Sequence, residues 1–415
     1  MNALVILLLC LVMFTSGADM LIMTPILPQV ANDLGVGVDV GGLWVTSYSI
    51  ATAAFALIFG PISDRVGRKP ILIAGIAVLA GGTAACGFAE GFTTMLVSRF
   101  VAGAGAGLLV TSTTSFVADH FPDEERAVVM GYVMSGFFLA LILGVPLGAF
   151  LAGTFGWHDM FFVFTGWAAL VALGLVLLPK PRLEIRSKEL SIGGALRAYF
   201  ELLKDRKVLG VLLMSAAIGA SMTMFSVYTS PWFANAFGLD TSDRGLVYAV
   251  GGPAVLIGGP MAGRLSNRFG RVTLILAGSA LMATMQLVLP TTPRASDWIA
   301  GHVDGSAFTQ LGDVGWPIVA PALLCFVLAM LAGSMRSAPF QTLALEIVRA
   351  ERRGALAAIR NTFNHGGSGI GAALGGAVWA AAEHPYPSVC LLAATLTVAG
   401  GALLYLLVGR DNPAV

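Results

Sequence analysis

The sequence predicts an all-α integral membrane protein in which twelve membrane-spanning helices form two pseudo-symmetric six-helix bundles. Three observations predict this fold class. Hydrophobic residues make up 57% of the chain and charged residues only 11%, whereas soluble domains carry about 25% charged residues. The apolar residues gather in twelve runs, each long enough to cross a bilayer as a helix of about 20 residues. Finally, one charged loop motif occurs in each half of the chain.

The twelve apolar runs lie on either side of a polar joint. The six runs of the first half are near residues 3–28, 40–61, 70–89, 92–118, 127–153 and 158–178. The six runs of the second half are near residues 207–234, 243–265, 271–290, 316–345, 355–382 and 386–408. The first run lacks the positively charged start of a signal peptide, so we expect it to be retained as the first span. We therefore expect six-helix bundles at residues 1–178 and 207–415.

The joint, residues 179–206, is expected to be a cytoplasmic linker. Its apolar residues Leu196, Tyr199, Phe200 and Leu203 recur near helical spacing among charged residues. This pattern predicts a short helix that lies on the membrane surface. A solvated linker without a helix is the alternative.

Basic residues predict the orientation, because cytoplasmic loops of membrane proteins are enriched in Lys and Arg. With both termini in the cytoplasm, 19 of the 24 basic residues fall in cytoplasmic loops or the C-terminal tail, two, Arg244 and Arg294, in outer loops and three inside spans. We therefore expect a multi-pass protein of the cell (inner) membrane with both termini cytoplasmic. The net charge of +1 gives no reason to expect a nucleic-acid partner.

The residues indicate no enzymatic chemistry. Each of the four cysteines lies inside an apolar run, where we expect a buried hydrophobic residue rather than a disulfide or a metal ligand. The sequence contains no metal-ligand cluster, no nucleophile motif and no nucleotide-binding loop. We therefore expect no metal, no cofactor and no enzyme.

The repeated loop motif indicates an internal duplication. Its first copy covers residues 60–69 and its second copy residues 263–272, which is 203 residues later. A second pair of matching segments, residues 119–126 and 346–353, has an offset of 227 residues. The difference predicts an insertion of 24 residues in the second half, and the polar stretch 291–315 is the expected place for it. Two equivalent bundles are the physical basis of alternating access.

With these motifs the chain resembles the transporters of the major facilitator superfamily over essentially its whole length. Residues 60–69 resemble the superfamily's signature loop between the second and third helices. Residues 99–105 resemble the Arg-x-x-x-Gly pattern of its fourth helix. The resemblance implies a monomeric secondary active transporter, whose partners are a small-molecule substrate, protons and the lipid bilayer.

Two further motifs resemble those of proton-coupled exporters. The fifth-helix packing motif of antiporters is matched by Gly144, Pro146 and Gly148, although here Val145 separates the first glycine from the proline. Asp19, followed by two prolines in the same span, resembles the first-helix pattern of twelve-span drug:proton antiporters. The resemblance implies proton-coupled efflux (antiport) of a drug-like molecule or of a polar or anionic metabolite. The alternatives are a proton-coupled importer or facilitator of a small metabolite, and a membrane sensor or scaffold that transports nothing.

Asp19 and Arg99 are the expected proton-coupling residues. An ionisable group inside a span is costly unless it is paired or hydrated, so each one is a functional candidate. At 1.5 Å per residue, the two lie at depths that agree within about 3 Å, so we expect them to face one cavity and to interact. A carboxylate beside a guanidinium stays ionised, whereas a carboxylate in an apolar pocket takes up a proton. A static structural pair is the alternative.

The signature loop is expected to act as a conformational latch that closes the bundles together when the cavity opens outward. Arg68 would form a charge-assisted pair with Asp119, and in the superfamily the corresponding acid has this part. The expected latch residues are Gly60, Asp64, Arg65, Gly67, Arg68, Asp119, Arg268, Glu346 and Arg353. Simple anchoring of the cytoplasmic side by positive charge is the alternative.

The spans of the second half contain unusually many polar residues. The substrate-binding candidates among them are Arg336, Gln341, Arg360, Asn361, Asn364 and His365. The last four share a helical stripe, because residues four apart lie on one face. If Asp19 pairs with Arg99, these cations have no internal counterion, which favours an anionic or strongly hydrogen-bonding substrate. Alternatively, the arginines extend to the cytoplasmic surface and the histidine is an ordinary interior residue.

Aromatic residues are candidates for the wall of a substrate cavity. They are Tyr48, Phe137 and Tyr228, together with Trp44, Phe138, Phe225 and Trp232. For the two tryptophans a place in the interfacial aromatic belt is an equal alternative.

Overall fold

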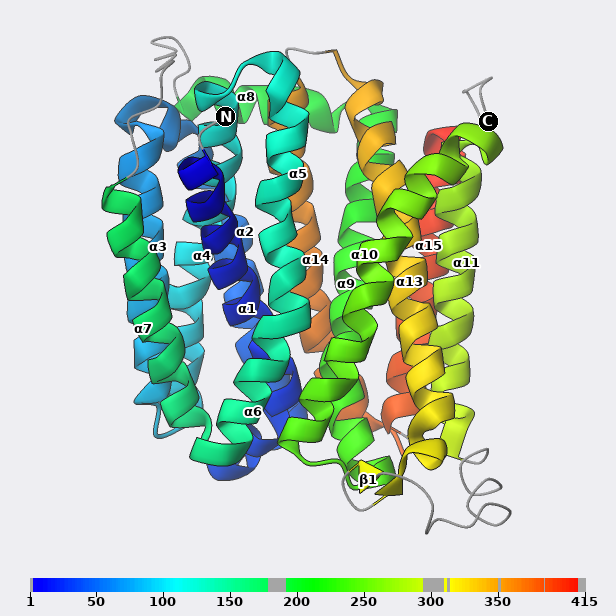
Figure 1. Ribbon diagram of the computed structural model, residues 1–415. Coiled ribbons are helices and arrows are strands. Elements are labelled where there is room, and N and C mark those ends of the chain that lie inside the picture. Colours follow the sequence, from blue (N-terminus) through cyan, green and yellow to red (C-terminus); the bar gives the residue numbers. More distant parts are fainter. Residues whose placement is uncertain are drawn as a thin grey trace.

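The computed structural model describes residues 3–177, 192–293, 310–311, 314–349, 352–383 and 385–409. The helices of the first half are α1 (Ala3–Asp33), α2 (Val38–Val66), α3 (Arg68–Gly87), α4 (Phe92–His120), α5 (Asp123–Leu139), the π-helix η1 (Ala140–Gly144), α6 (Val145–Phe155) and α7 (Trp157–Val176). Next come α8 (Ile192–Leu203), α9 (Arg206–Phe237), α10 (Thr241–Phe269), α11 (Arg271–Val288) and the 3-10 helix η2 (Leu289–Thr291). The chain ends with β1 (Gln310–Leu311), β2 (Val314–Gly315), α13 (Trp316–Ile347), α14 (Arg353–Ala381) and α15 (Pro385–Leu407), as Figure 1 shows.

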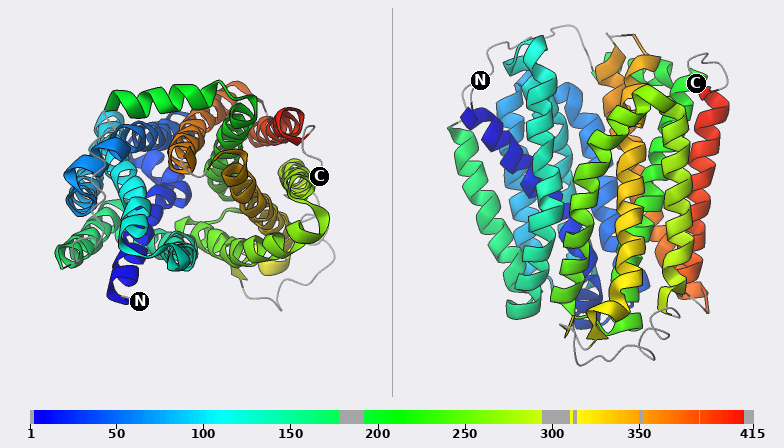
Figure 2. Two further views of the ribbon diagram at one scale, coloured as in Figure 1. Left: turned by 90° about the horizontal axis from the view of Figure 1, so that it is seen from above. Right: turned by 45° about the vertical axis from the view of Figure 1, so that its right-hand side comes forward.

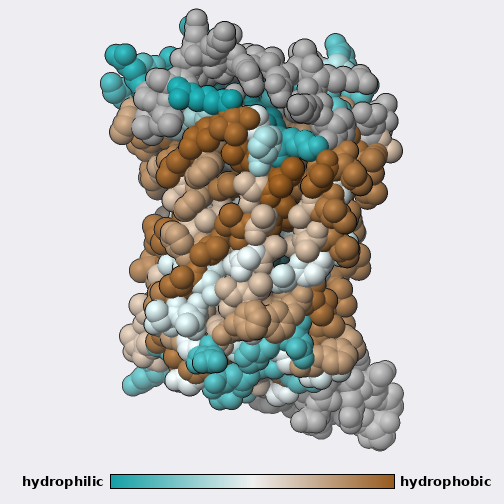
Figure 3. Space-filling model, turned by 90° about the vertical axis from the view of Figure 1, so that its left-hand side faces the viewer, coloured by the Kyte–Doolittle hydropathy of each residue, from teal (hydrophilic) through white to brown (hydrophobic). Residues whose placement is uncertain are grey.

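The helices confirm the predicted all-α membrane architecture. Within the described ranges, eleven spans are long and apolar enough to cross a membrane, one of them formed by α5, η1 and α6 together. The remaining predicted span, residues 355–382, forms α14, whose 29 residues are also long enough to cross. Hydrophobic side chains cover the middle of the surface in Figure 3, and hydrophilic ones lie toward both ends.

Two bundles of six spans pack side by side. In the first, α4 packs against α2 and α3, α7 against α3, and α5 against α1. In the second, α9 packs against α14 and α15, while α13 packs against α10 and α11. The bundles meet where α2 packs against α14, and where η1 and α6 pack against α10. The two contacts are equivalent under the pseudo-symmetry of the fold, because each joins the second span of one bundle to the fifth span of the other.

Both termini and α8 lie at one end of the molecule, which we call the terminal face, and we call the opposite end the far face (Figure 1). The helix α8 lies across the terminal face, at a steep angle to the spans, as the view from above in Figure 2 shows. It contacts α2, α9 and α14, with Tyr199 and Leu202 buried. The described part of the linker therefore forms a helix, whose place on the membrane surface stays a prediction, and residues 178–191 lie outside the described part of the chain.

Equivalent ion pairs in the two bundles agree with the predicted duplication. Arg68 pairs with Asp119 at 2.8 Å, and Arg271 pairs with Glu346. The offsets of 203 and 227 residues relate the arginines and the acids, respectively. Both loop motifs also turn at a glycine with positive φ, Gly67 at 103° and Gly270 at 82°, a conformation that favours glycine.

The described residues of the predicted insertion lie at the far face (Figure 1). Its described residues include the short antiparallel pair of β1 and β2, in which Gln310 pairs with Gly315. Residues 294–309 and 312–313 of this stretch lie outside the described part of the chain.

Candidate functional site

A buried ion pair joins α1 to α4 inside the first bundle. Arg99 donates from Nη1 to Asp19 Oδ2 at 3.1 Å and from Nη2 to the backbone carbonyl of Asp19, also at 3.1 Å. Both residues are almost completely buried, with 1% of Asp19 and none of Arg99 exposed. The structure therefore brings the two residues together as expected from their depths. It encloses them within one bundle, however, and not at the wall of a water-accessible cavity.

Helices α2 and α3 complete the surroundings of this pair. The Thr83 hydroxyl donates to Asp19 Oδ1 at 2.7 Å, and the Arg99 guanidinium lies 4.3 Å from the centre of the Tyr48 ring. Buried ion pairs are tolerated when additional hydrogen bonds satisfy their atoms, and here only Arg99 Nε lacks a partner among the described residues. Tyr48 is thus a contact of the ion pair, and the prediction that it walls a substrate cavity is wrong for this conformation.

The fifth-helix motif connects this ion pair to the second bundle. A Cβ atom added at Gly144 would meet Ala18, and one added at Gly148 would overlap the side chain of Ile22. On α1, Ala18 lies directly before Asp19 and Ile22 lies one turn after it. On another side of the same span, Pro146 lies against Gly245 of α10. The π-helix η1, a feature often found at functional sites, begins this segment.

A cluster centred on Arg244 joins the bundles at the far face. Ser230 Oγ and Arg244 Nε both donate to the carbonyl of Pro25 at 3.1 Å. Thr241 Oγ1 donates to Gln29 Oε1, also at 3.1 Å. Arg244 makes two further bonds inside its own bundle, to the Leu239 carbonyl at 2.8 Å and to Thr241 at 3.0 Å. We call Pro25, Gln29, Ser230, Thr241 and Arg244 the far-face cluster.

Helices α2 and α14 pack closely against each other on the far-face side of the molecule. Tyr228 donates to the Ala372 carbonyl at 2.9 Å, and its hydroxyl occupies the space that a Cβ atom at Gly42 would need. Thr46 donates to the Gly369 carbonyl at 2.9 Å. Tyr228 is therefore a fully buried contact between the bundles in this conformation, and not the wall of an open cavity.

The polar residues of α14 do not all face the same neighbouring helix. Asn364 donates to the Ser215 carbonyl of α9 at 3.2 Å, so its side of α14 faces α9. The side that carries Gly369 faces α2. Asn361 and His365 lie between these two sides, by the helical repeat of 3.6 residues, and therefore face the interior between the bundles. The Nδ1 atom of His365 is buried without a hydrogen-bond partner among the described residues.

The other predicted substrate residues lie in different surroundings. Gln341 is exposed near the terminal end of α13, and its place beside the interior stripe of α14 stays a prediction. Phe137 lies against Gly17 of α1, within the first bundle. Arg360 is partly exposed, one turn closer to the terminal face than Asn364. Arg336 is 1% exposed, and none of its three side-chain nitrogens has a partner among the described residues.

The predicted latch residues form contacts within each bundle. Arg68 donates to Asp119 of α4 and, at 2.6 Å, to Ser63 at the end of α2, so it ties together three helices of one bundle. Arg353 donates to the Leu345 carbonyl at 3.0 Å and caps the end of α13. The partner of Glu346 is Arg271, whereas the Arg268 guanidinium lies over the ring of Phe269, at 5.3 Å from its centre.

The remaining latch residues are at the ends of α2. Arg65 is exposed, and Gly60 has open space where a Cβ atom would lie. The side chain of Asp64 is outside the described part of the structure.

Thr83 and Arg244 are functional candidates that sequence reasoning missed. Thr83 is uncharged, so its sequence position carries no signal by itself. The duplication provides a signal, because the offset of 203 residues relates Thr83 to Gln286. Gln286 donates to Ser221 at 3.0 Å, and Ser221 contacts Thr397 at 2.5 Å. The second bundle thus has a buried polar network at the equivalent place, built from uncharged residues.

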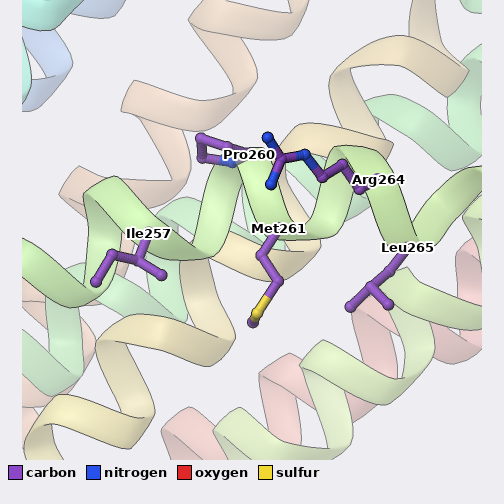
Figure 4. A pocket seen from close by; sticks show the side chains of 5 residues that line it. All are labelled: Ile257, Pro260, Met261, Arg264 and Leu265. Carbon is purple, nitrogen blue, oxygen red and sulfur yellow. The ribbon is translucent and has the colours of Figure 1, made fainter.

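Two hollows lie on the surface, away from the ion pair. One has a volume of about 450 Å³ and is lined by Ile257, Pro260, Met261, Arg264 and Leu265 of α10 (Figure 4). The other, of about 500 Å³, lies on α6 and α7 beside Asp159. Neither contains a residue of the ion pair or of the far-face cluster.

Comparison with known proteins places the chain among transporters. The model of the Major Facilitator Superfamily matches residues 9–324. The MFS-type transporter YceJ of Bacillus subtilis (strain 168) is 26% identical over 374 residues, which cover 90% of this chain and 88% of YceJ. The Multidrug resistance protein Stp of Mycobacterium tuberculosis (strain ATCC 25618 / H37Rv) is 25% identical over 421 residues, which cover 89% of this chain and 74% of Stp.

The fold is also that of solved transporters. The crystal structure of a D-xylose-proton symporter superposes with a TM-score of 0.75 at 16% sequence identity, covering 98% of this chain and 97% of the symporter. Together with the two pseudo-symmetric bundles, these matches establish that the chain belongs to the Major Facilitator Superfamily and is a secondary transporter.

Proposed function

We propose that this transporter exports a small molecule in exchange for protons, and that Asp19 and Arg99 couple the two movements. The observation that carries the proposal is the buried Asp19 carboxylate, which accepts from Arg99 and Thr83 inside the first bundle. An intramembrane carboxylate is rare and costly, and such groups form proton relays in pumps and transporters. The similarity to a multidrug resistance protein supports export as the direction.

The proposed chemistry is an exchange between an ion pair and a protonated acid. While the pair with Arg99 is formed, the Asp19 carboxylate stays ionised. If a change of conformation separates the two groups, the carboxylate is left in apolar surroundings and takes up a proton. Arg99 keeps its charge in both states, and the Tyr48 ring provides it with a cation–π contact. One proton would therefore bind for each separation of the pair.

The fifth-helix motif is the proposed link to the movement of the bundles. Because Gly144 and Gly148 pack directly against α1 on either side of Asp19, a shift of α1 would press on this span. Well-packed interiors respond to such shifts by moving between discrete arrangements rather than by bending. Pro146 would pass the shift to Gly245 of α10, at the contact between the bundles.

The proposed cycle also assigns a direction to the present conformation. The far-face cluster and the contact of α2 with α14 hold the bundles together on the far-face side. With the terminal face in the cytoplasm, as positive charge predicts, this arrangement is closed to the outside with the ion pair formed. Protons would then be released toward the cytoplasm, and they would bind in the opposite arrangement.

Transport by reconstituted protein tests the proposal. Everted membrane vesicles with an imposed proton gradient are supplied with a panel of cationic dyes, neutral drugs and radiolabelled organic acids. Proton-driven accumulation of at least one compound is expected. Asp19→Asn keeps the size of the side chain and one acceptor oxygen but cannot exchange a proton, so it should reduce accumulation at least 100-fold. Asp159→Asn, a matched change at the far-face end of α7, should leave the rate within twofold of the wild type.

Two results would contradict the proposal. Accumulation by Asp19→Asn at the wild-type rate would show that the pair is a static structural element. Accumulation that follows the proton gradient in right-side-out vesicles, and not in everted ones, would make the protein an importer.

A further inference from the structure

Three arginines among the described residues are almost completely buried, and they differ in their partners. Arg99 has a carboxylate, a carbonyl and an aromatic ring. Arg244 has two carbonyls and a hydroxyl. Arg336, which is 1% exposed, has no hydrogen-bond partner on Nε, Nη1 or Nη2 among the described residues. The first two sites follow the rule that buried charges are paired or hydrogen-bonded, and the third departs from it.

Arg336 cannot escape this cost by losing its charge, because arginine remains protonated in proteins. A carboxylate from its own bundle is also out of reach. The described acids of α9 to α15 lie at helix ends, where Glu346 is ten residues, or about 15 Å, further along α13. Glu346 is moreover paired with Arg271. In this arrangement the described residues therefore leave Arg336 without a counterion from its own bundle and without a hydrogen-bond partner.

The position of Arg336 is close to the interior polar residues of α14. A Cβ atom added at Gly333, one turn earlier on α13, would lie 3.6 Å from the sulfur of Met222 on α9. One turn from Met222, Gly219 of α9 is packed directly against the backbone of Asn364. Arg336 and Asn364 are therefore at about the same depth, on two sides of the glycine-containing segment of α9.

The helix that carries Arg336 has a point at which it can bend. Pro339 lies inside α13, and an interior proline removes one backbone hydrogen bond and kinks a helix. Gly278 of α11 contacts the Arg336 Cβ atom, so α11 and α13 approach closely here. A bend at Pro339 would change the depth and direction of the guanidinium without unfolding the helix.

We propose that Arg336 is an anion-binding residue, and that its partner is a singly charged acid group, such as a carboxylate, on the molecule that the protein carries. This inference rests on the proposed transport function and specifies the class of substrate. A small free anion such as chloride has the same charge and is the other possible source of the partner. The acid group would neutralise Arg336 when α13 bends toward the interior face of Asn361 and His365.

Thermal unfolding of the purified full-length protein in detergent tests this inference. Unfolding midpoints are measured in a low-salt buffer as reference and after addition of sodium formate, acetate, benzoate or chloride at equal ionic strength, with benzamide as the neutral match of benzoate. The variants are Arg336→Gln and Arg336→Lys. Arg264→Gln is the control, since it removes the same charge from an exposed arginine at the surface hollow of α10.

A carboxylate at about ten times its dissociation constant should raise the wild-type midpoint by roughly 2 °C. Arg336→Gln should lose this rise and Arg336→Lys should keep part of it, while Arg264→Gln should keep all of it. In the low-salt buffer alone, Arg336→Gln should unfold at a higher temperature than the wild type, because it removes an unpaired buried charge.

Three results would overturn the inference. No rise of the wild-type midpoint with any carboxylate would exclude an acid-binding site, and an equal rise in Arg336→Gln would place the site elsewhere. A rise with chloride alone would assign Arg336 to a free inorganic anion rather than to the cargo. The assay uses no proton gradient, so these results are independent of whether Asp19 couples transport to protons.

Discussion

Replacing Arg244 should open the far face. The side chain makes one hydrogen bond that crosses between the bundles, from Nε to the Pro25 carbonyl at 3.1 Å, and two bonds within its own bundle. Only the crossing bond distinguishes the closed arrangement from an open one. A bond from a charged donor contributes about 2 kcal/mol, so Arg244→Met should increase the ratio of open to closed molecules roughly 30-fold.

Smaller changes to the same cluster calibrate this expectation. Ser230→Ala removes one uncharged crossing bond, from Ser230 to Pro25, which contributes about 1 kcal/mol. It should therefore increase the open-to-closed ratio only about fivefold. Arg264→Met removes an arginine from the exposed side of α10 and should leave the ratio unchanged.

Distances between spin labels across the far face measure the ratio. Labels at Glu90→Cys and Glu383→Cys, in a background without the four native cysteines, lie at exposed positions of the first and second bundle. The longer-distance population should grow in the order wild type, Ser230→Ala, Arg244→Met. A folded Arg244→Met protein with the wild-type distance distribution would refute the assignment of this cluster as a closure of the far face.

Two further predictions concern packing and backbone conformation. Gly148→Val should lower the free energy of unfolding by about 1–3 kcal/mol, because the valine side chain would overlap Ile22. The control is Gly60→Val, at a helix position with open space. Equal unfolding midpoints for the two variants would contradict the packing argument. Gly67→Ala and Gly270→Ala should each cost about 1–2 kcal/mol, because both glycines have positive φ; midpoints equal to the wild type would show that these turns tolerate an L side chain without strain.

The parts of the fold that sequence predicted are those that the bilayer constrains directly. A span needs about 20 apolar residues, so the twelve apolar runs located every membrane helix, α14 included. The similar depths of Asp19 and Arg99 in the membrane also predicted their contact, because a charge inside a membrane is costly unless it is paired. The ion pairs of Arg68 and Arg271 lie at positions that the two predicted offsets, 203 residues for the arginines and 227 for the acids, relate to each other.

The features that sequence did not predict depend on the direction of a side chain around its helix. Depth does not say whether a residue faces a cavity or the core of its own bundle, and this is why Tyr48 belongs to the ion pair. Arg244 was assigned to an outer loop, but α10 already begins at Thr241, so the arginine lies in the first turn and faces α1. Gln341 shares a helix with Arg336 but lies on a different, exposed side.

The pH dependence of the far-face distance tests the central claim most directly, since it needs no knowledge of the substrate. With the same two spin labels, lowering the pH should protonate Asp19, weaken its pair with Arg99 and shift the wild-type protein toward the longer distance. Asp19→Asn, which has no charge to lose, should give one distribution with a large long-distance population at every pH. A pH response in Asp19→Asn equal to that of the wild type, or a wild-type distribution that does not change with pH, would contradict coupling through this pair.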